Sequence, residues 1–195
     1  NYCGDLSANK INVFLSEERK SRPPLPQKQK RSVTYSSCGL CGSDMIEDLG
    51  KSIEKIKIKT TVEFPKLSQM QQAVVEKQDV HRATRGTHAA GIFDAQGNLL
   101  SFAEDVGRHN ALDKAIGKIL FERRIHEAAI VHLSSRLSYE MVMKTARLGA
   151  EILTGVSSAT SLAIELASAT GITLIGSFRE NRGNVFTYPE RLLIL

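Results

Sequence analysis

Two continuous apolar segments constrain the fold of this chain more than any other feature. Residues 128–133 read AAIVHL and residues 172–178 read ITLIGSF. A strand with one solvent-exposed face alternates apolar and polar side chains, so these segments predict strands that are buried on both faces. Segments with apolar side chains at helical spacing lie between and after them, at 139–148 and 161–170. Such alternation of buried strands and helices is typical of an α/β fold.

The same alternation extends over most of the chain after residue 64. We expect helices at 66–78, 110–123, 139–148 and 161–170, and strands at 88–94, 98–103, 128–133, 152–156, 172–178 and 184–188. A turn at 95–97 makes the first two strands a hairpin. The predicted fold is a three-layer α/β/α sandwich with a mixed sheet. In such a fold the ligand site lies beyond the carboxyl ends of the parallel strands.

The first 37 residues differ from the rest of the chain. Residues 11–15 have the pattern of a short strand, and residues 16–37 are rich in Lys, Arg, Gln, Ser and Pro. Proline and this polar composition fit poorly in a packed element. We therefore expect 1–37 to be the end of an upstream β region plus a basic, proline-rich loop, and 38–195 to form the α/β/α domain.

Composition limits the classes of function. A chain of 195 residues with 42% hydrophobic residues can bury one substantial core. Three cysteines are too few for a disulfide framework, and residues 1–20 lack the pattern of a secretory signal, so we expect a cytoplasmic protein without a membrane span. The basic segment lacks interleaved aromatic residues, which favours a solvated linker over nucleic-acid binding.

The strongest chemical motif is Cys38-Gly39-Leu40-Cys41-Gly42, at the end of the basic loop. Flanking glycines leave both thiols uncrowded. Three interpretations stay open. A zinc half-site needs two further ligands, and only scattered histidines could supply them. A thioredoxin-like dithiol would follow the first strand of a βαβ unit. The third interpretation is a persulfide carrier, in which one thiolate accepts a sulfur atom and later expels it.

A second polar motif, EDVGRHN at 104–110, falls where a predicted strand gives way to a helix. Free N–H groups at the helix start, together with Arg108 and His109, could bind an anion there. The structural alternative is that Asp105 or Asn110 caps the helix and that Arg108 pairs with Glu104.

Two further polar clusters follow the two buried strands. Ser134-Ser135-Arg136 comes after AAIVHL, and residues 179–184 come after ITLIGSF. Arginine binds phosphate in a bidentate manner, and acidic or amide side chains can pair with the edge of a base. Because such clusters meet at one edge of a sheet, they predict a pocket for a large nucleotide derivative that carries phosphate.

Four long phrases of the chain resemble a known family. SSCGLCG, THAAGIFDAQGNLLSFAEDVGRHNALDKAIG, SSRLSYEMVMKTARLGAEILTGVSSATSLAIELA and GITLIGSFRENRGNVFTYPERL are similar to successive motifs of the formate dehydrogenase accessory sulfurtransferase family (FdhD/NarQ). The resemblance covers nearly everything from Ser36 onward. It departs from the family pattern at Thr84-Arg85-Gly86, where the family usually has Thr-Gly-Gly, and between Ala159 and Thr160, where the family usually has a proline.

The resemblance implies a cytidine-deaminase-like fold and a specific activity. Family members pass persulfide sulfur from a cysteine desulfurase to the molybdenum bis(molybdopterin guanine dinucleotide) cofactor of formate dehydrogenase, and are expected to be homodimers. The cofactor is a bound substrate, and no permanently bound metal is expected. Family members usually carry a β-rich N-terminal region, so this chain is expected to be truncated upstream of Asn1.

The resemblance also implies roles for individual residues. Cys38 looks like the persulfide-bearing cysteine and Cys41 like its neighbour. The family's cofactor-binding segment corresponds to Phe178, Arg179, Glu180, Asn181, Arg182 and Gly183. Arg108, His109 and Arg136 are added from the pocket argument. Two alternative functions stay open: a cofactor-binding chaperone without sulfur transfer, and a zinc-dependent deaminase-like enzyme, although the chain lacks an H-x-E motif.

Overall fold

A computed structural model of the chain describes residues 16–18 and 55–193. The chain divides into two compact units, Asn1–Gly42 and Ser43–Leu195, and the elements below belong to the second. The strand predicted at 11–15, the basic loop and the Cys38/Cys41 motif lie outside the described residues. Within the described part of the chain, no helix is long and apolar enough to cross a membrane.

A mixed six-stranded sheet forms the centre of this unit, with the strand order β3-β2-β4-β5-β6-β7. Its strands are β2 (His88–Phe93), β3 (Leu99–Asp105), β4 (Ile130–Leu133), β5 (Ile152–Gly155), β6 (Thr173–Arg179) and β7 (Arg182–Val185). The three central strands β4, β5 and β6 are parallel. Strand β2 runs antiparallel to both β3 and β4, and β7 runs antiparallel to β6.

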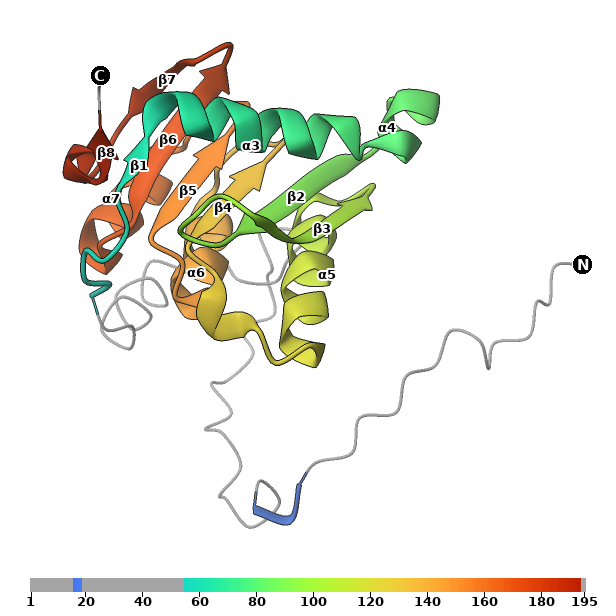
Figure 1. The fold of residues 1–195 in the computed structure, drawn as a ribbon, viewed down its shortest axis with the longest axis horizontal. Helices are drawn as coiled ribbons and strands as arrows, with labels where there is room; N and C mark the ends of the chain where they lie inside the picture. Colours follow the sequence, from blue (N-terminus) through green and yellow to red (C-terminus); the bar gives the residue numbers. More distant parts are fainter. Residues whose placement is uncertain (1–15, 19–54, 194–195) are drawn as a thin grey trace, which may run out of the picture. The chain divides into compact units, whose positions relative to one another are not determined.

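Helices cover both faces of the sheet (Figure 1). Helix α3 (Phe64–Glu76) crosses one face, while α5 (Arg108–Phe121), α6 (Tyr139–Leu148) and α7 (Ser161–Thr170) lie against the other. The mixed sheet and its two helical layers confirm the predicted α/β/α sandwich. The cytidine-deaminase-like label stays a prediction.

The central strands are apolar throughout because they are buried on both faces, as predicted. Ile130 and Ile152 belong to the core that also contains Met70 and Val74 of α3. Their neighbours Val131 and Leu153 are equally buried but lie outside that core, because successive side chains of a strand point to opposite faces.

Several features differ from the sequence prediction. Helix α3 begins and ends two residues earlier than the predicted 66–78. Helix α4 (Asp79–Thr84) has no buried residue, so no apolar stripe marks it. The clustered residues after β6 form a hairpin with β7 rather than a loop. Helix α5 begins at Arg108, two residues earlier than expected. A small parallel sheet pairs β1 (Val62–Glu63) with β8 (Leu192–Leu193), and single 3₁₀ turns occur at Ile125–Glu127 and Pro189–Arg191.

A buried ion pair connects the small sheet to the large one. The Arg191 side chain is fully buried, and its Nε donates to Glu151 Oε2 at 3.1 Å. The same carboxylate accepts hydrogen bonds from the backbone N–H groups of Lys59 and Thr60 and from the Thr60 hydroxyl. Burial acts to raise the pKa of Glu151, but these hydrogen bonds outweigh it, so the pKa is lowered.

We predict that Arg191→Met will lower the free energy of unfolding by about 3 to 5 kcal/mol, because it leaves a buried carboxylate without its cation. Urea denaturation at pH 7 measures this change. The exposed pair of Arg124 and Glu127 provides the control, since Arg124→Met should cost less than about 1 kcal/mol. Equal effects of the two substitutions would contradict a special role for the buried pair.

His132 of β4 is a buried titratable group in the same core. Its side chain is almost inaccessible, its ring Nδ1 lies 2.7 Å from the Thr154 hydroxyl, and its ring packs edge-on against Phe178. Burial disfavours the charged form and lowers the pKa of His132 to about 4.

A pH dependence of stability follows from the lowered pKa. Between pH 4 and pH 6.5 the unfolded chain binds a proton at His132 that the folded chain does not, so stability should rise with pH in this window. We expect the wild type to lose about 2 kcal/mol at this site between pH 7.5 and pH 5. Denaturation of wild type and His132→Leu at both pH values tests this, with exposed His126→Leu as the control. A pH dependence retained in His132→Leu would contradict the assignment.

Candidate functional site

The polar segments singled out in the sequence meet at one edge of the sheet. Ser134 follows β4, Val156 follows β5 and Arg179 ends β6, and these parallel strands all end at this edge. The antiparallel strand β2 begins there with His88, whose partner in the register is Asp105 at the end of β3. The predicted convergence of the strand-end clusters is therefore present in the fold.

A cavity of about 750 Å³ opens at this edge beside α3. Its polar lining comes from α3, the α3–α4 connection, α4 and the strand ends, and includes Ser68, Gln71, Gln72, Gln78, His81, Arg85, Thr87, His88, Ser134, Arg179 and Glu180. A volume of this size is in the range of small-molecule sites. We call this cavity the strand-end pocket.

Several lining residues were not found by sequence reasoning. Ser68, Gln71, Gln72, Val75 and Gln78 are spaced by three or four residues, which places them on one face of the helix and its continuation. This polar face of a predicted helix was the available signal. Gln78 is 8% exposed and its side chain belongs to the pocket lining.

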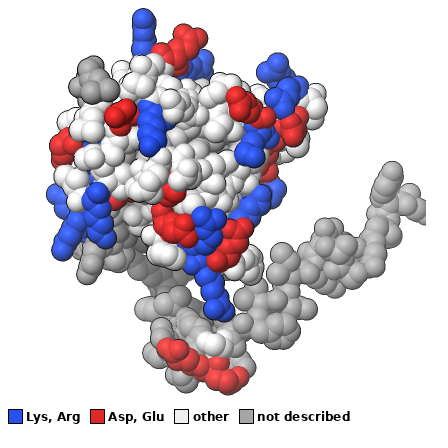
Figure 2. Space-filling view, viewed as in Figure 1, with Lys and Arg blue, Asp and Glu red and all other residues white. Residues whose placement is uncertain are grey.

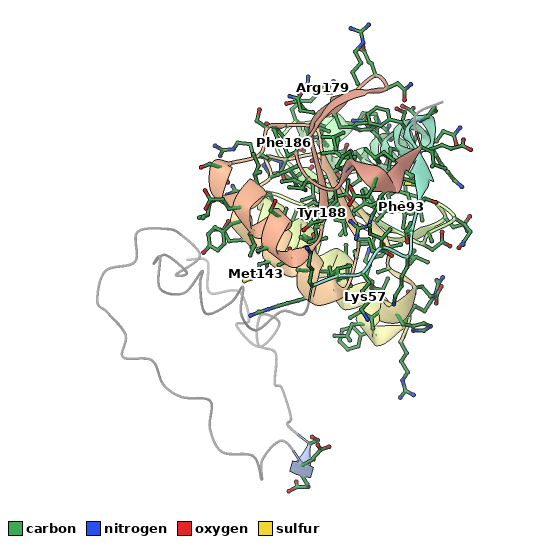
Figure 3. All side chains as sticks on the ribbon, turned by 90° about the vertical axis from the view of Figure 1, so that its left-hand side faces the viewer. Lys57, Phe93, Met143, Arg179, Phe186 and Tyr188 are labelled. Carbon is green, nitrogen blue, oxygen red and sulfur yellow. The ribbon has the colours of Figure 1, made fainter. Side chains whose placement is uncertain are left out.

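The β6–β7 hairpin aims Arg179 at the pocket. Its two turn residues, Glu180 and Asn181, both have positive φ, at 47° and 60°, as a type I′ turn requires. The pairing of the two strands is irregular between Gly176 and Arg179, and Ser177 in this bulge has φ of 52°. A bulge re-aims side chains, so Phe178 enters the core while Arg179 stays exposed. Figure 3 shows Arg179 near the top of the folded unit, well away from Lys57.

Helix α3 holds this hairpin in place through two hydrogen bonds. Gln71 Nε2 donates to the carbonyl oxygen of Phe178 at 2.8 Å, and Ser68 Oγ donates to Asn181 Oδ1 at 3.1 Å. The Phe178 ring also packs edge-on against Phe64 of α3, with the ring centroids 5.4 Å apart. These contacts position the segment without using the side chains of Arg179 or Glu180.

The predicted cofactor-binding residues differ in their position relative to the pocket. Arg179 and Glu180 line the pocket, whereas the side chain of Phe178 is buried in the core. Asn181, Arg182 and Gly183 lie on the hairpin, outside the pocket lining. Arg108 and His109 begin α5 and Arg136 lies in the connection from β4 to α6, so these three residues flank the pocket without lining it.

The cations at this edge lack carboxylate partners. Among the described residues, no carboxylate lies within 4 Å of Arg85, Arg108, Arg136 or Arg182. The Arg108 Nε and His109 Nε2 atoms are buried without a hydrogen-bond partner. Figure 2 shows Lys and Arg side chains next to Asp and Glu side chains at both ends of the face that α3 covers. The arginines without a carboxylate partner in the described part of the chain favour an anionic ligand.

The two acidic residues of the EDVGRHN motif are used by the scaffold. Glu104 accepts hydrogen bonds from the N–H groups of Val80 and His81, which begin α4, and from the Thr87 hydroxyl. The expected Arg108–Glu104 ion pair is therefore absent from this part of the structure. The expected cap is also wrong, since no side chain caps the start of α5.

Asp105 stabilises the turn before α5. It forms an ion pair with Lys114 at 2.5 Å and accepts hydrogen bonds from Gly107 N and Asn110 Nδ2. The Lys114 hydrogen bond is the main cause that lowers the pKa of Asp105 to about 2. Asp105 is therefore ionised, and its oxygens bind Lys114, Gly107 N and Asn110 Nδ2 rather than Arg108 or His109.

Cys38 and Cys41 lie outside the described residues, so their roles in the site stay predictions. Among the described residues, no group of three or more His, Cys, Asp or Glu side chains could hold a metal ion.

The fold and the pocket define the class of layered α/β proteins, in which ligand sites lie beyond the carboxyl ends of the parallel strands. The model of the FdhD/NarQ family matches residues 5–193 of the chain. The chain therefore belongs to the FdhD/NarQ family, as its motifs predicted.

Curated relatives support this assignment. The chain is 39% identical over 190 residues to the sulfur carrier protein FdhD of Sulfurisphaera tokodaii, covering 97% of this chain and 73% of the relative. It is 40% identical over 191 residues to the sulfur carrier protein FdhD of Saccharolobus solfataricus, covering 96% of this chain and 71% of the relative.

A solved structure shares the fold. The match is a protein assigned as a formate dehydrogenase accessory protein from Desulfotalea psychrophila, with a TM-score of 0.68 and 33% sequence identity. The alignment covers 75% of this chain and 62% of that chain, which is less than two thirds of its length.

Proposed function

We propose that this chain is a sulfur carrier that passes persulfide sulfur from a cysteine desulfurase to the molybdenum bis(molybdopterin guanine dinucleotide) cofactor of formate dehydrogenase. The observation that carries the proposal is the similarity, along nearly the whole chain, to relatives named sulfur carrier protein FdhD. The Cys38/Cys41 motif supplies the thiols that such a carrier needs.

The transfer uses ordinary thiol chemistry. The Cys38 thiolate attacks the outer sulfur of the desulfurase persulfide, the S–S bond of that persulfide breaks, and the desulfurase thiolate leaves. Cys38 then carries the sulfur as a persulfide. If the Cys41 thiolate attacks the outer sulfur, one S–S bond replaces another and Cys38 returns to its thiolate form without any oxidant or reductant. Delivery of the sulfur to the cofactor as sulfide takes up two electrons. The cysteine pair would supply them when the Cys41 thiolate attacks the Cys38 sulfur, because a Cys38–Cys41 disulfide then forms and the outer sulfur leaves as sulfide.

The strand-end pocket supports cofactor binding as the second half of the function. In this proposal the guanine nucleotide end of the cofactor enters the pocket, Arg179 and Arg182 meet its phosphates, and Glu180 or Asn181 pairs with the base. Arg179 and Arg182 are paired across the hairpin, so both can reach one diphosphate. Arg108 and Arg136 extend the positive charge along the same edge, and His109, whose pKa is lowered by burial, adds a neutral imidazole.

The proposal includes the partners and the assembly that the family resemblance implies. We infer a cysteine desulfurase as the donor, formate dehydrogenase as the recipient and a homodimer as the working form in the cytoplasm. A cofactor-binding chaperone without sulfur transfer uses the same pocket, and the cysteine experiment below distinguishes it.

Cys38→Ala should leave the fold intact and abolish the protein-bound persulfide, because the nucleophilic thiolate is lost. Incubation with a cysteine desulfurase and cysteine, followed by mass spectrometry, detects one added sulfur atom on the wild type and none on the variant. The variant should also fail to activate formate dehydrogenase. Cys3→Ala is the matched control and should behave like wild type. Full dehydrogenase activation by Cys38→Ala would favour the chaperone alternative.

Arg182→Ala should weaken the binding of guanine nucleotides by roughly tenfold to a hundredfold, because a charge-assisted contact is worth on the order of 1.5 to 3 kcal/mol. Arg179→Ala should have an effect of similar size. Calorimetry with GDP and ADP measures both variants against Arg124→Ala, a control far from the pocket. ADP should bind more weakly than GDP, because a site built for the guanine edge leaves its polar groups unpaired with adenine. Unchanged affinities in both variants would remove the hairpin from the site.

A further inference from the structure

His88 is a pocket residue that no sequence motif assigned. It is the first residue of β2, lines the strand-end pocket and is half-buried. Its ring nitrogens have no hydrogen-bond partner among the described residues, whereas His81 Nδ1 lies 2.7 Å from the Thr87 carbonyl oxygen and His132 Nδ1 lies 2.7 Å from the Thr154 hydroxyl.

Several cationic side chains from different elements lie around His88. Burial is the main cause that lowers the pKa of His88, and the charges of Arg108 on α5, His81 on α4 and Arg136 after β4 lower it further. Arg85 and Arg179 line the same pocket. A histidine in these surroundings is neutral at neutral pH, because protonation would add one more positive charge to the cluster.

The carboxylates near this cluster are already engaged. Glu104 uses its oxygens for the start of α4 and for Thr87, and Asp105 uses its oxygens for Lys114 and the turn before α5. Glu180, the remaining acidic residue of the pocket lining, is exposed on the hairpin turn. The described part of the chain therefore presents a cationic cluster around an imidazole without a hydrogen-bond partner, an arrangement that favours an anionic ligand.

We propose that His88 contacts the anionic phosphate group of the ligand in the strand-end pocket and takes up one proton from solvent when that group binds. The inference rests on the proposed function, because it assigns a further contact and a pH dependence to the same cofactor site. The ligand chemistry is a phosphate or diphosphate group, as in a nucleotide diphosphate.

The sign of the pH dependence follows from charge. A bound anion stabilises the imidazolium, so the pKa of His88 should be higher in the complex than in the free protein. At any pH between the two values, binding takes up protons, and affinity falls as pH rises. A fully coupled proton corresponds to at most a tenfold loss of affinity per pH unit.

The direct test is NMR titration of the histidine ring protons of the full chain, with and without saturating inorganic pyrophosphate. The His88 signal is identified by its absence from His88→Gln. We expect a midpoint below 6.5 in the free protein and a higher midpoint in the complex. The wild-type titration does not depend on how well the variant folds.

Calorimetry provides a second readout. Pyrophosphate binding at pH 7 in two buffers of different ionisation enthalpy gives the number of protons taken up. Wild type and the exposed control His126→Gln should take up the same number, and His88→Gln should take up fewer and bind several-fold more weakly. The ionisation of pyrophosphate itself is common to all three proteins and cancels in the comparison.

Two outcomes would overturn the proposal. A His88 midpoint that does not move in the saturated protein would show that His88 does not contact the anion. A wild-type chain that binds no pyrophosphate but still carries a persulfide on Cys38 would also overturn it, and the sulfur carrier role would stand without this pocket. If the wild-type chain carries no persulfide on Cys38 but its His88 midpoint rises on pyrophosphate binding as expected, the proposed sulfur carrier function would be contradicted instead.

Discussion

The parallel pairing of β4, β5 and β6 is the constraint on which the rest of the site depends. Ile130 lies opposite Ile152, which lies opposite Thr173, so the three strands run in step and end at one edge. Their connections therefore start at that edge, and so do α6 and α7. Since β2 runs the other way, its first residue, His88, is added to the same edge. The register brings residues more than ninety positions apart in the sequence into one pocket.

The parts of the fold that sequence predicted are those with strong local patterns. Helices α6 and α7 have the predicted bounds of 139–148 and 161–170, because each carries an apolar face and ends before a glycine in the left-handed conformation. The β6–β7 hairpin was not predicted. Its turn places Glu180 and Asn181 at positive φ, which local propensity assigns to glycine or asparagine, and glutamate gives no such signal. Contacts from α3 hold this turn in place.

The site was predicted at the level of strand ends and missed at the level of individual contacts. Arg179 and Glu180 were found because charged residues after a buried strand are conspicuous. Gln78 and His88 were missed because a single glutamine or histidine at the end of an element resembles ordinary surface polarity. Their significance comes from lining the pocket, which depends on tertiary packing. Cys38 itself lies outside the described part of the chain, so its predicted role stays a prediction.

The distribution of charge explains why this edge favours an anion although the net charge of the chain is only +5. Carboxylates that could neutralise the edge are used to hold the scaffold together: Glu104 starts α4, Asp105 fixes the turn before α5, and Glu151 pairs with Arg191 at the small sheet. Each of these roles places the negative charge against backbone N–H groups or away from the pocket. Among the described residues, the guanidinium groups of Arg108 and Arg136 consequently have no carboxylate partner, which favours a phosphate-bearing ligand at this edge.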